Sequence, residues 1–131
     1  MRNLAKAILA AIAAMFVAIP ALAAPTWTNY SAERFASAQA AGRTIVVDVH
    51  ADWCPTCKAQ APILETLRND KRLENVTFMR VDFDTEKDFL RTHRVPRQST
   101  ILVFKGKQET GRSIAETDPA RLRSFVLQAV R

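Results

Sequence analysis

The segment VVDVHADWCPTCKAQAPILE, residues 46–65, contains both cysteines of this chain, Cys54 and Cys57. A disulfide between them would close a very small loop, and such loops constrain the unfolded chain least. Small secreted domains that depend on disulfides usually have four or more cysteines. A closed zinc site needs four ligands, and only His50 and the distant His93 could join the pair. The spacing therefore favours dithiol–disulfide exchange over a structural bridge or a zinc site.

The residues around the cysteines predict a strand, a turn and a helix. Residues 43–49 are rich in β-branched side chains, as in a short buried strand, and a helix follows from Cys54 onward. Pro55 falls at or near the first helical position, where its missing N–H costs nothing. Free backbone N–H groups and the helix dipole at this end stabilise a thiolate, which lowers the pKa of Cys54. We expect an exposed Cys54 to attack a disulfide and a more buried Cys57 to resolve the mixed disulfide.

The predicted helix that follows Cys54 is amphipathic, as is typical of a helix that packs on a sheet. Small or apolar residues favour one side, namely Ala59, Ala61, Ile63, Leu64 and Leu67. The predicted polar side contains Lys58, Gln60, Glu65 and Arg68.

The stretch DVHADWCPTCKAQAPIL, residues 48–64, strongly resembles the active-site segment of thioredoxin-like proteins. The resemblance covers residues 44–131 and extends more loosely back to residue 30. It implies a thioredoxin fold, an α/β architecture with a central mixed β-sheet flanked by helices. It also implies a thiol:disulfide oxidoreductase that needs no organic cofactor, and it assigns no residue as a metal ligand.

The resemblance carries roles over to individual catalytic residues. Cys54 and Cys57 match the redox-active disulfide, with Cys54 attacking and Cys57 resolving. Asp48 matches the buried acid that accepts the proton of the resolving thiol, and burial would raise its pKa towards that task. Arg80 stands where the family usually has a lysine near that acid, and Pro62 matches the proline that kinks the active-site helix.

A partner-binding surface is implied in the same way, formed by Trp53, Pro55, Ser99 and Thr100. Family members usually place a cis-proline before this threonine, whereas this chain has Ser99, and Pro96 lies three residues too early. A cis bond without proline costs about 3–4 kcal/mol, which favours a trans peptide before Ser99. The Ser99 hydroxyl could then hydrogen-bond the Cys54 thiolate. The backbone here is expected to pair with an extended substrate segment.

Together with the strand and helix of the cysteine segment, the chain predicts helix, strand, helix, strand, helix, strand, strand and helix in that order. The signals are a Ser31 start and a Gly42 stop for the first helix, and a Thr85 cap for the third. The predicted elements outside the cysteine segment are a helix at 31–42, strands at 75–84, 99–105 and 108–112, and helices from 85 and 118. The last helix carries an apolar stripe of Leu122, Phe125, Val126 and Val130, which we expect in the core.

Residues 1–23 have the anatomy of a secretory signal peptide. Arg2 and Lys6 precede an apolar run at 7–19, and Ala21-Leu22-Ala23 has the small-x-small pattern that precedes cleavage between Ala23 and Ala24. The alternative is an uncleaved anchor, although spanning a bilayer takes about 20 apolar residues. We therefore expect a periplasmic or secreted domain of residues 24–131.

The charges of that domain do not suggest nucleic acid as a partner. The net charge is +6 for the whole chain and +4 without Arg2 and Lys6, and the charges are scattered. We expect a monomer that exchanges electrons with protein thiols and disulfides in the periplasm. An exported protein of this kind also needs a membrane electron donor or acceptor.

Three functions agree with the sequence. The first is an exported thiol:disulfide oxidoreductase, reducing rather than oxidising. The second is a periplasmic copper-binding protein or metallochaperone that uses Cys54 and Cys57, with His50 or a partner completing the site, because soft thiolates suit cuprous ion. Met79 is the one methionine left in the mature chain, which disfavours copper. The third is an interaction module that has lost redox activity, which retention of both cysteines and Asp48 argues against.

Overall fold

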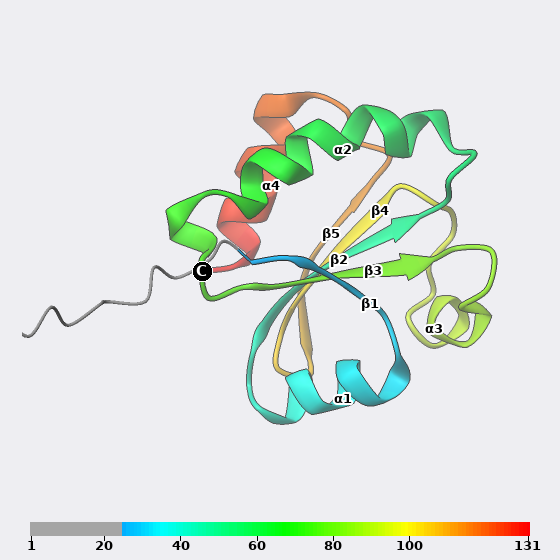
Figure 1. The fold of residues 1–131 in the computed structure, drawn as a ribbon, viewed down its shortest axis with the longest axis vertical. Helices are drawn as coiled ribbons and strands as arrows, with labels where there is room; N and C mark the ends of the chain where they lie inside the picture. The colour runs from blue at the N-terminus through cyan, green and yellow to red at the C-terminus, as the bar shows by residue number, and fades with distance from the viewer. Residues whose placement is uncertain (1–24) are drawn as a thin grey trace, which may run out of the picture.

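The computed structural model describes residues 25–131, so the predicted signal peptide lies outside the described residues. A five-stranded mixed sheet with the order β1-β3-β2-β4-β5 forms its centre (Figure 1). Strands β1, β3 and β2 are parallel, whereas β4 is antiparallel to β2 and β5 to β4. The strands are β1 (Trp27–Asn29), β2 (Thr44–His50), β3 (Thr77–Asp82), β4 (Thr100–Lys105) and β5 (Gln108–Ile114).

Helices cover both faces of the sheet, which confirms the predicted thioredoxin-fold architecture. Helices α2 and α4 lie on one face and α1 and α3 on the other (Figure 1). Their bounds are α1 (Ala32–Ala40), α2 (Pro55–Arg68), α3 (Lys87–Thr92) and α4 (Pro119–Ala129), with a 3₁₀ turn η1 (Lys71–Leu73) after α2. No helix within residues 25–131 is long and apolar enough to cross a bilayer.

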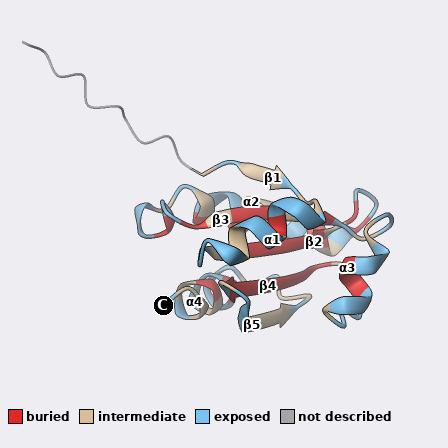
Figure 2. Ribbon diagram, turned by 90° about the horizontal axis from the view of Figure 1, so that it is seen from below, coloured by how far each residue is buried: buried red, intermediate tan, exposed pale blue. Residues whose placement is uncertain are grey.

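Alternation along the central strands divides the core into two clusters. In β2, Val46 faces α2 and α4, while Val47 and Val49 face α1 and α3, because successive strand residues point to opposite faces. Figure 2 shows β2 and β4 buried and the edge strand β5 only partly so. The cysteines and helix α2 are thus supported by a sheet whose central strands are buried on both faces.

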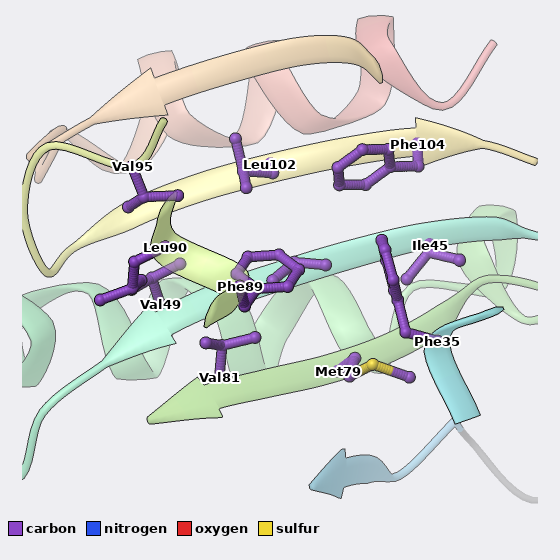
Figure 3. Packing of buried hydrophobic residues seen from close by; sticks show 11 residues of the cluster. Phe35, Ile45, Val49, Met79, Val81, Phe89, Leu90, Val95, Leu102 and Phe104 are labelled. Atoms are coloured by element: carbon purple, nitrogen blue, oxygen red, sulfur yellow. The ribbon is translucent and has the colours of Figure 1, made fainter. Parts of the chain in front are cut away.

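The cluster on the α1 and α3 face is built around aromatic rings (Figure 3). The ring centroids of Phe35 lie 5.5 Å from Phe89 and 5.2 Å from Phe104. His93 joins them, 4.4 Å from the Phe89 ring, and burial lowers its pKa below the ordinary value. His93 therefore belongs to this aromatic core on the face opposite α2.

Two predicted features differ from the structure. Strand β1 was not predicted, and it exists because Trp27–Asn29 pair with residues 78–80 of β3. Thr85 is not the cap of α3, which has Glu86 at that position and no side-chain capping bond. Thr85 and Asp84 instead donate their backbone N–H groups to the Asp82 carboxylate, which closes the turn after β3. The Asp82 side chain thus stabilises the turn before α3, and no side chain caps the helix itself.

Candidate active site

Cys54 occupies the junction between strand β2 and helix α2, where it caps the helix. Its backbone N–H donates to the Ala51 carbonyl, 3.1 Å away, and Pro55 follows as the first helical residue. The Cys54 sulfur accepts the backbone N–H of Cys57 at 3.1 Å. The sulfur thus takes the place of the oxygen that usually caps a helix. The predicted helix start is confirmed.

Both thiols are buried, contrary to the expectation of an exposed Cys54. Cys54 has no exposed surface and Cys57 is 2% exposed, so Cys57 is not the more buried of the two. Ala51 and Phe83 pack against the pair, and Ser99 lies over both sulfurs. The sequence placed Cys54 correctly at a helix end, but the loop before β4 closes over that end.

Ser99 contacts both cysteines through one hydroxyl. Its Oγ lies 3.1 Å from the Cys54 sulfur and 3.2 Å from the Cys57 sulfur, as hydrogen bonds. The peptide before it is trans, since residues 25–131 contain no cis bond. The predicted hydrogen bond between the hydroxyl and Cys54 is therefore present, and it extends to Cys57 as well.

The backbone at Ser99 is held in an unfavourable conformation. Its φ is +64°, in the left-handed region that costs an L-residue roughly 1–2 kcal/mol. Two backbone bonds fix it, from the Ser99 N–H to the Val49 carbonyl at 2.8 Å and from the Ala115 N–H to the Ser99 carbonyl at 3.0 Å. The surrounding strands β2 and β5 thus impose the position from which the hydroxyl reaches both sulfurs.

The two thiols differ in acidity because they differ in hydrogen bonding. Burial opposes ionisation of Cys54, but bonds from Cys57, Ser99 and Gln98 outweigh it and hold the pKa of Cys54 below its ordinary value. Burial raises the pKa of Cys57, and so does the bond that its thiol makes with Cys54. Of the two thiols, Cys54 therefore forms a thiolate more readily, which is the form that acts as a nucleophile.

Asp48 is a buried acid on the same face of β2 as Val46, the face that α2 covers. Its Oδ2 lies 3.2 Å from the Arg80 Nε and 3.9 Å from the His50 Nδ1. Burial raises the pKa of Asp48 against the lowering effect of Arg80 and His50. Its Oδ1 is buried and has no hydrogen-bond partner among the described residues. That oxygen can accept a proton.

His50 makes its contacts with carboxylates. Its Nε2 lies 3.2 Å from Oδ1 of the exposed Asp52, and its Nδ1 faces Asp48. The imidazole borders a cavity of about 320 Å³ that also reaches Arg80 and Glu86. His50 therefore lies between the buried acid and solvent.

The four residues implied for partner binding divide into two pairs. Trp53 is 56% exposed, and its indole N–H donates to the Asp84 carboxylate at 2.8 Å, while Pro55 is exposed beside it. Ser99 and Thr100 are buried, and the Thr100 hydroxyl donates to a loop carbonyl, that of Arg97, at 2.7 Å. Of these four residues, only Trp53 and Pro55 are therefore exposed to solvent.

Gln60 is a residue that the sequence analysis placed on the wrong side of helix α2. It is fully buried, and its amide nitrogen donates to the Ser99 carbonyl at 3.2 Å and the Glu116 carbonyl at 2.9 Å. The signal was present, because Gln60 precedes Ile63, Leu64 and Leu67 by three, four and seven positions, the spacing of one helix face.

Comparisons with known proteins agree with this geometry. The family model described as Thioredoxin matches residues 26–128. The chain belongs to the thioredoxin family. Thioredoxins are thiol:disulfide oxidoreductases of the protein-disulfide reductase type, and the chain is an enzyme of this class, as the resemblance implied.

Individual thioredoxins align with most of the described chain. Thioredoxin of Chlamydia trachomatis serovar D is 34% identical over 88 residues, covering 67% of this chain and 83% of that protein. A bifunctional thioredoxin reductase/thioredoxin of Mycobacterium leprae is 31% identical over 88 residues, 67% of this chain and 19% of that protein. The crystal structure of Trxlp from Edwardsiella tarda EIB202 matches with a TM-score of 0.73 at 41% identity, covering 76% of this chain and 97% of that one.

Proposed function

We propose that residues 24–131 form an exported thioredoxin that reduces disulfides of partner proteins through Cys54 and Cys57. The observation that carries the proposal is the pair of thiols at the start of α2, where hydrogen bonds lower the pKa of Cys54 and burial raises the pKa of Cys57. Export rests on the signal-like residues 1–23. The chain then needs a membrane electron donor, because an exported protein has no contact with cytosolic reductants.

The first step is attack by the Cys54 thiolate on one sulfur of the partner's disulfide. A bond forms between Cys54 and that sulfur, and the partner's other sulfur leaves with the bonding electrons and takes up a proton. Since Cys54 and Ser99 are both fully buried, the loop before β4 must move aside for the partner to enter. Trp53 and Pro55 offer the exposed surface on which the partner docks before that movement.

The second step releases the partner in reduced form. Cys57 loses its proton and attacks the Cys54 sulfur, so that the mixed disulfide breaks and the partner leaves as a dithiol. Asp48 is the acceptor for that proton, since its pKa is raised and its Oδ1 is unpartnered. Two electrons have then passed to the partner, and a Cys54–Cys57 disulfide remains for the donor to reduce.

The equilibrium reduction potential of the Cys54–Cys57 couple tests the direction of electron flow. The mature protein is equilibrated in dithiothreitol or glutathione buffers, and the fraction oxidised is measured by mass after alkylation. A value near the thioredoxin figure of about −270 mV supports a reductant, whereas one near about −120 mV marks an oxidant. Absence of a reversible two-electron couple contradicts the whole proposal.

Single cysteine variants test the order of attack. Cys54→Ser removes the nucleophile, so insulin reduction should fall to the uncatalysed rate. Cys57→Ser keeps the nucleophile but removes the resolving thiol, so mixed disulfides with substrate should accumulate and appear on non-reducing gels. Full activity in Cys54→Ser contradicts the mechanism.

A further inference from the structure

Gln60 connects three separate parts of the molecule around the cysteines. It lies on the buried face of α2, three residues after Cys57. Its amide nitrogen donates to the carbonyl of Ser99, before β4, and to that of Glu116, between β5 and α4. An uncharged polar side chain with no exposure is rare in a helix core, and here it satisfies two loop carbonyls.

The orientation of this amide follows from its surroundings. Both neighbours are carbonyl oxygens, which only accept hydrogen bonds, so the NH₂ group must face them. The Gln60 oxygen then points elsewhere and has no partner among the described side chains and backbone. An unpartnered buried oxygen is unfavourable. The two hydrogen bonds from the amide nitrogen to the Ser99 and Glu116 carbonyls therefore hold the amide in this orientation.

We propose that Gln60 is a positioning residue that holds the Ser99 loop over the active-site cysteines. Through the Ser99 carbonyl it helps fix φ at +64°, and that backbone angle brings the hydroxyl within 3.1 Å and 3.2 Å of the two sulfurs. Gln60 touches neither sulfur in any hydrogen bond that the structure shows. It acts on Cys54 through Ser99, and the inference rests on the proposed exchange chemistry of that cysteine.

Gln60→Met is the decisive substitution, because methionine keeps the length and flexibility of the side chain and removes both donors. The acid dissociation constant of Cys54 is measured from the pH dependence of thiolate absorbance in the reduced protein. We expect it to fall about three- to tenfold as the Ser99 hydroxyl loses its fixed position. Gln60→Asn, which is one methylene shorter and cannot reach both carbonyls, should shift it in the same direction.

The same substitution in a Ser99→Ala background separates positioning from general loss of stability. If Gln60 acts through the hydroxyl, Gln60→Met should change the Cys54 dissociation constant no further once the hydroxyl is absent. Val126→Ala, buried in α4, is the control that lowers stability and leaves Cys54 acidity unchanged. An equal shift in both backgrounds, or a shift matched by Val126→Ala, overturns the inference.

Insulin reduction by the wild-type protein is measured in parallel, so that the two proposals can fail separately. Absence of wild-type reduction contradicts the proposed function, while the thiolate titration still decides the role of Gln60. Normal wild-type reduction with unchanged Cys54 acidity in both Gln60 variants contradicts the positioning role alone.

Discussion

At the scale of single residues, the Ser99 hydroxyl makes a direct hydrogen bond to the Cys54 sulfur. Ser99→Ala removes a donor to the Cys54 thiolate, and hydrogen bonds to charged groups are the stronger ones. We expect the acid dissociation constant of Cys54 to fall about tenfold, measured by thiolate absorbance against pH. Ser99→Gly should give the same shift although glycine tolerates the positive φ. Unchanged acidity in both variants would show that the hydroxyl does not bond to the thiolate.

Asp48 makes stability depend on pH in a defined direction. Burial raises its pKa in the folded protein above the ordinary 3.8, so the folded state holds this proton more tightly than the unfolded state does. The stability that Asp48 contributes is therefore fully present at low pH, and it is lost as the pH rises from 3.8 through the raised folded value. Asp48→Asn stays neutral and does not suffer this loss.

Urea unfolding at a series of pH values measures how the stability contributed by Asp48 changes with pH. The unfolding free energy of Asp48→Asn minus that of the wild type should increase with pH across the window and then level off. Asp88→Asn on α3, where the carboxylate is exposed, is the matched control for removing an acidic group from the protein surface. A flat difference for Asp48→Asn would mean that burial does not raise its pKa.

The resemblance predicted Cys54 at the start of a helix and Arg80 beside Asp48, and both placements agree with the structure because these residues follow the family pattern position by position. It could not predict that Cys54 is covered, since the covering group, Ser99, lies 45 residues away. Gln60 was misplaced for a related reason. A glutamine is normally exposed, and its burial is favourable only because two loop carbonyls need donors.

At the scale of elements, the packing of β5 against α4 depends on the absence of a side chain. A Cβ at Gly111 would lie 2.8 Å from the Ala129 Cβ and 2.9 Å from the Phe125 Cε2. Gly111→Ala should lower the unfolding free energy by about 1–3 kcal/mol in urea titration, because overpacking forces neighbours from their preferred positions. Gln108→Ala on the same strand, with an exposed side chain, serves as the control. Wild-type stability in Gly111→Ala would contradict this close contact.

Elements with strong local signals were predicted, and those that depend on distant partners were not. Ser31 caps α1 as expected, accepting the Arg34 N–H at 3.2 Å. Strand β1 has only three residues and little periodicity of its own. Its position depends on tertiary contacts, with Trp27 edge-to-face on Phe78 at 5.4 Å and Arg80 4.8 Å over the Trp27 ring.

At the scale of the whole molecule, export is a prediction that a mass measurement tests. Protein recovered from the periplasm of a bacterial host should lack residues 1–23, with Ala24 as its first residue. Cleavage there leaves β1 intact, because the strand starts at Trp27. A full-length chain retained in the membrane fraction would instead indicate an uncleaved anchor.

The position of Ser99 late in the chain also determines how long the cysteines go unprotected. A polypeptide emerges amino end first, so Cys54 and Cys57 appear 45 and 42 residues before the serine that covers them. Until β4 pairs with β2, Ser99 is not held over the cysteines, and both sulfurs are accessible to oxidants and to other thiols. The cover over this dithiol therefore comes from a part of the chain made well after the cysteines, and it is complete only when β4 has joined the sheet.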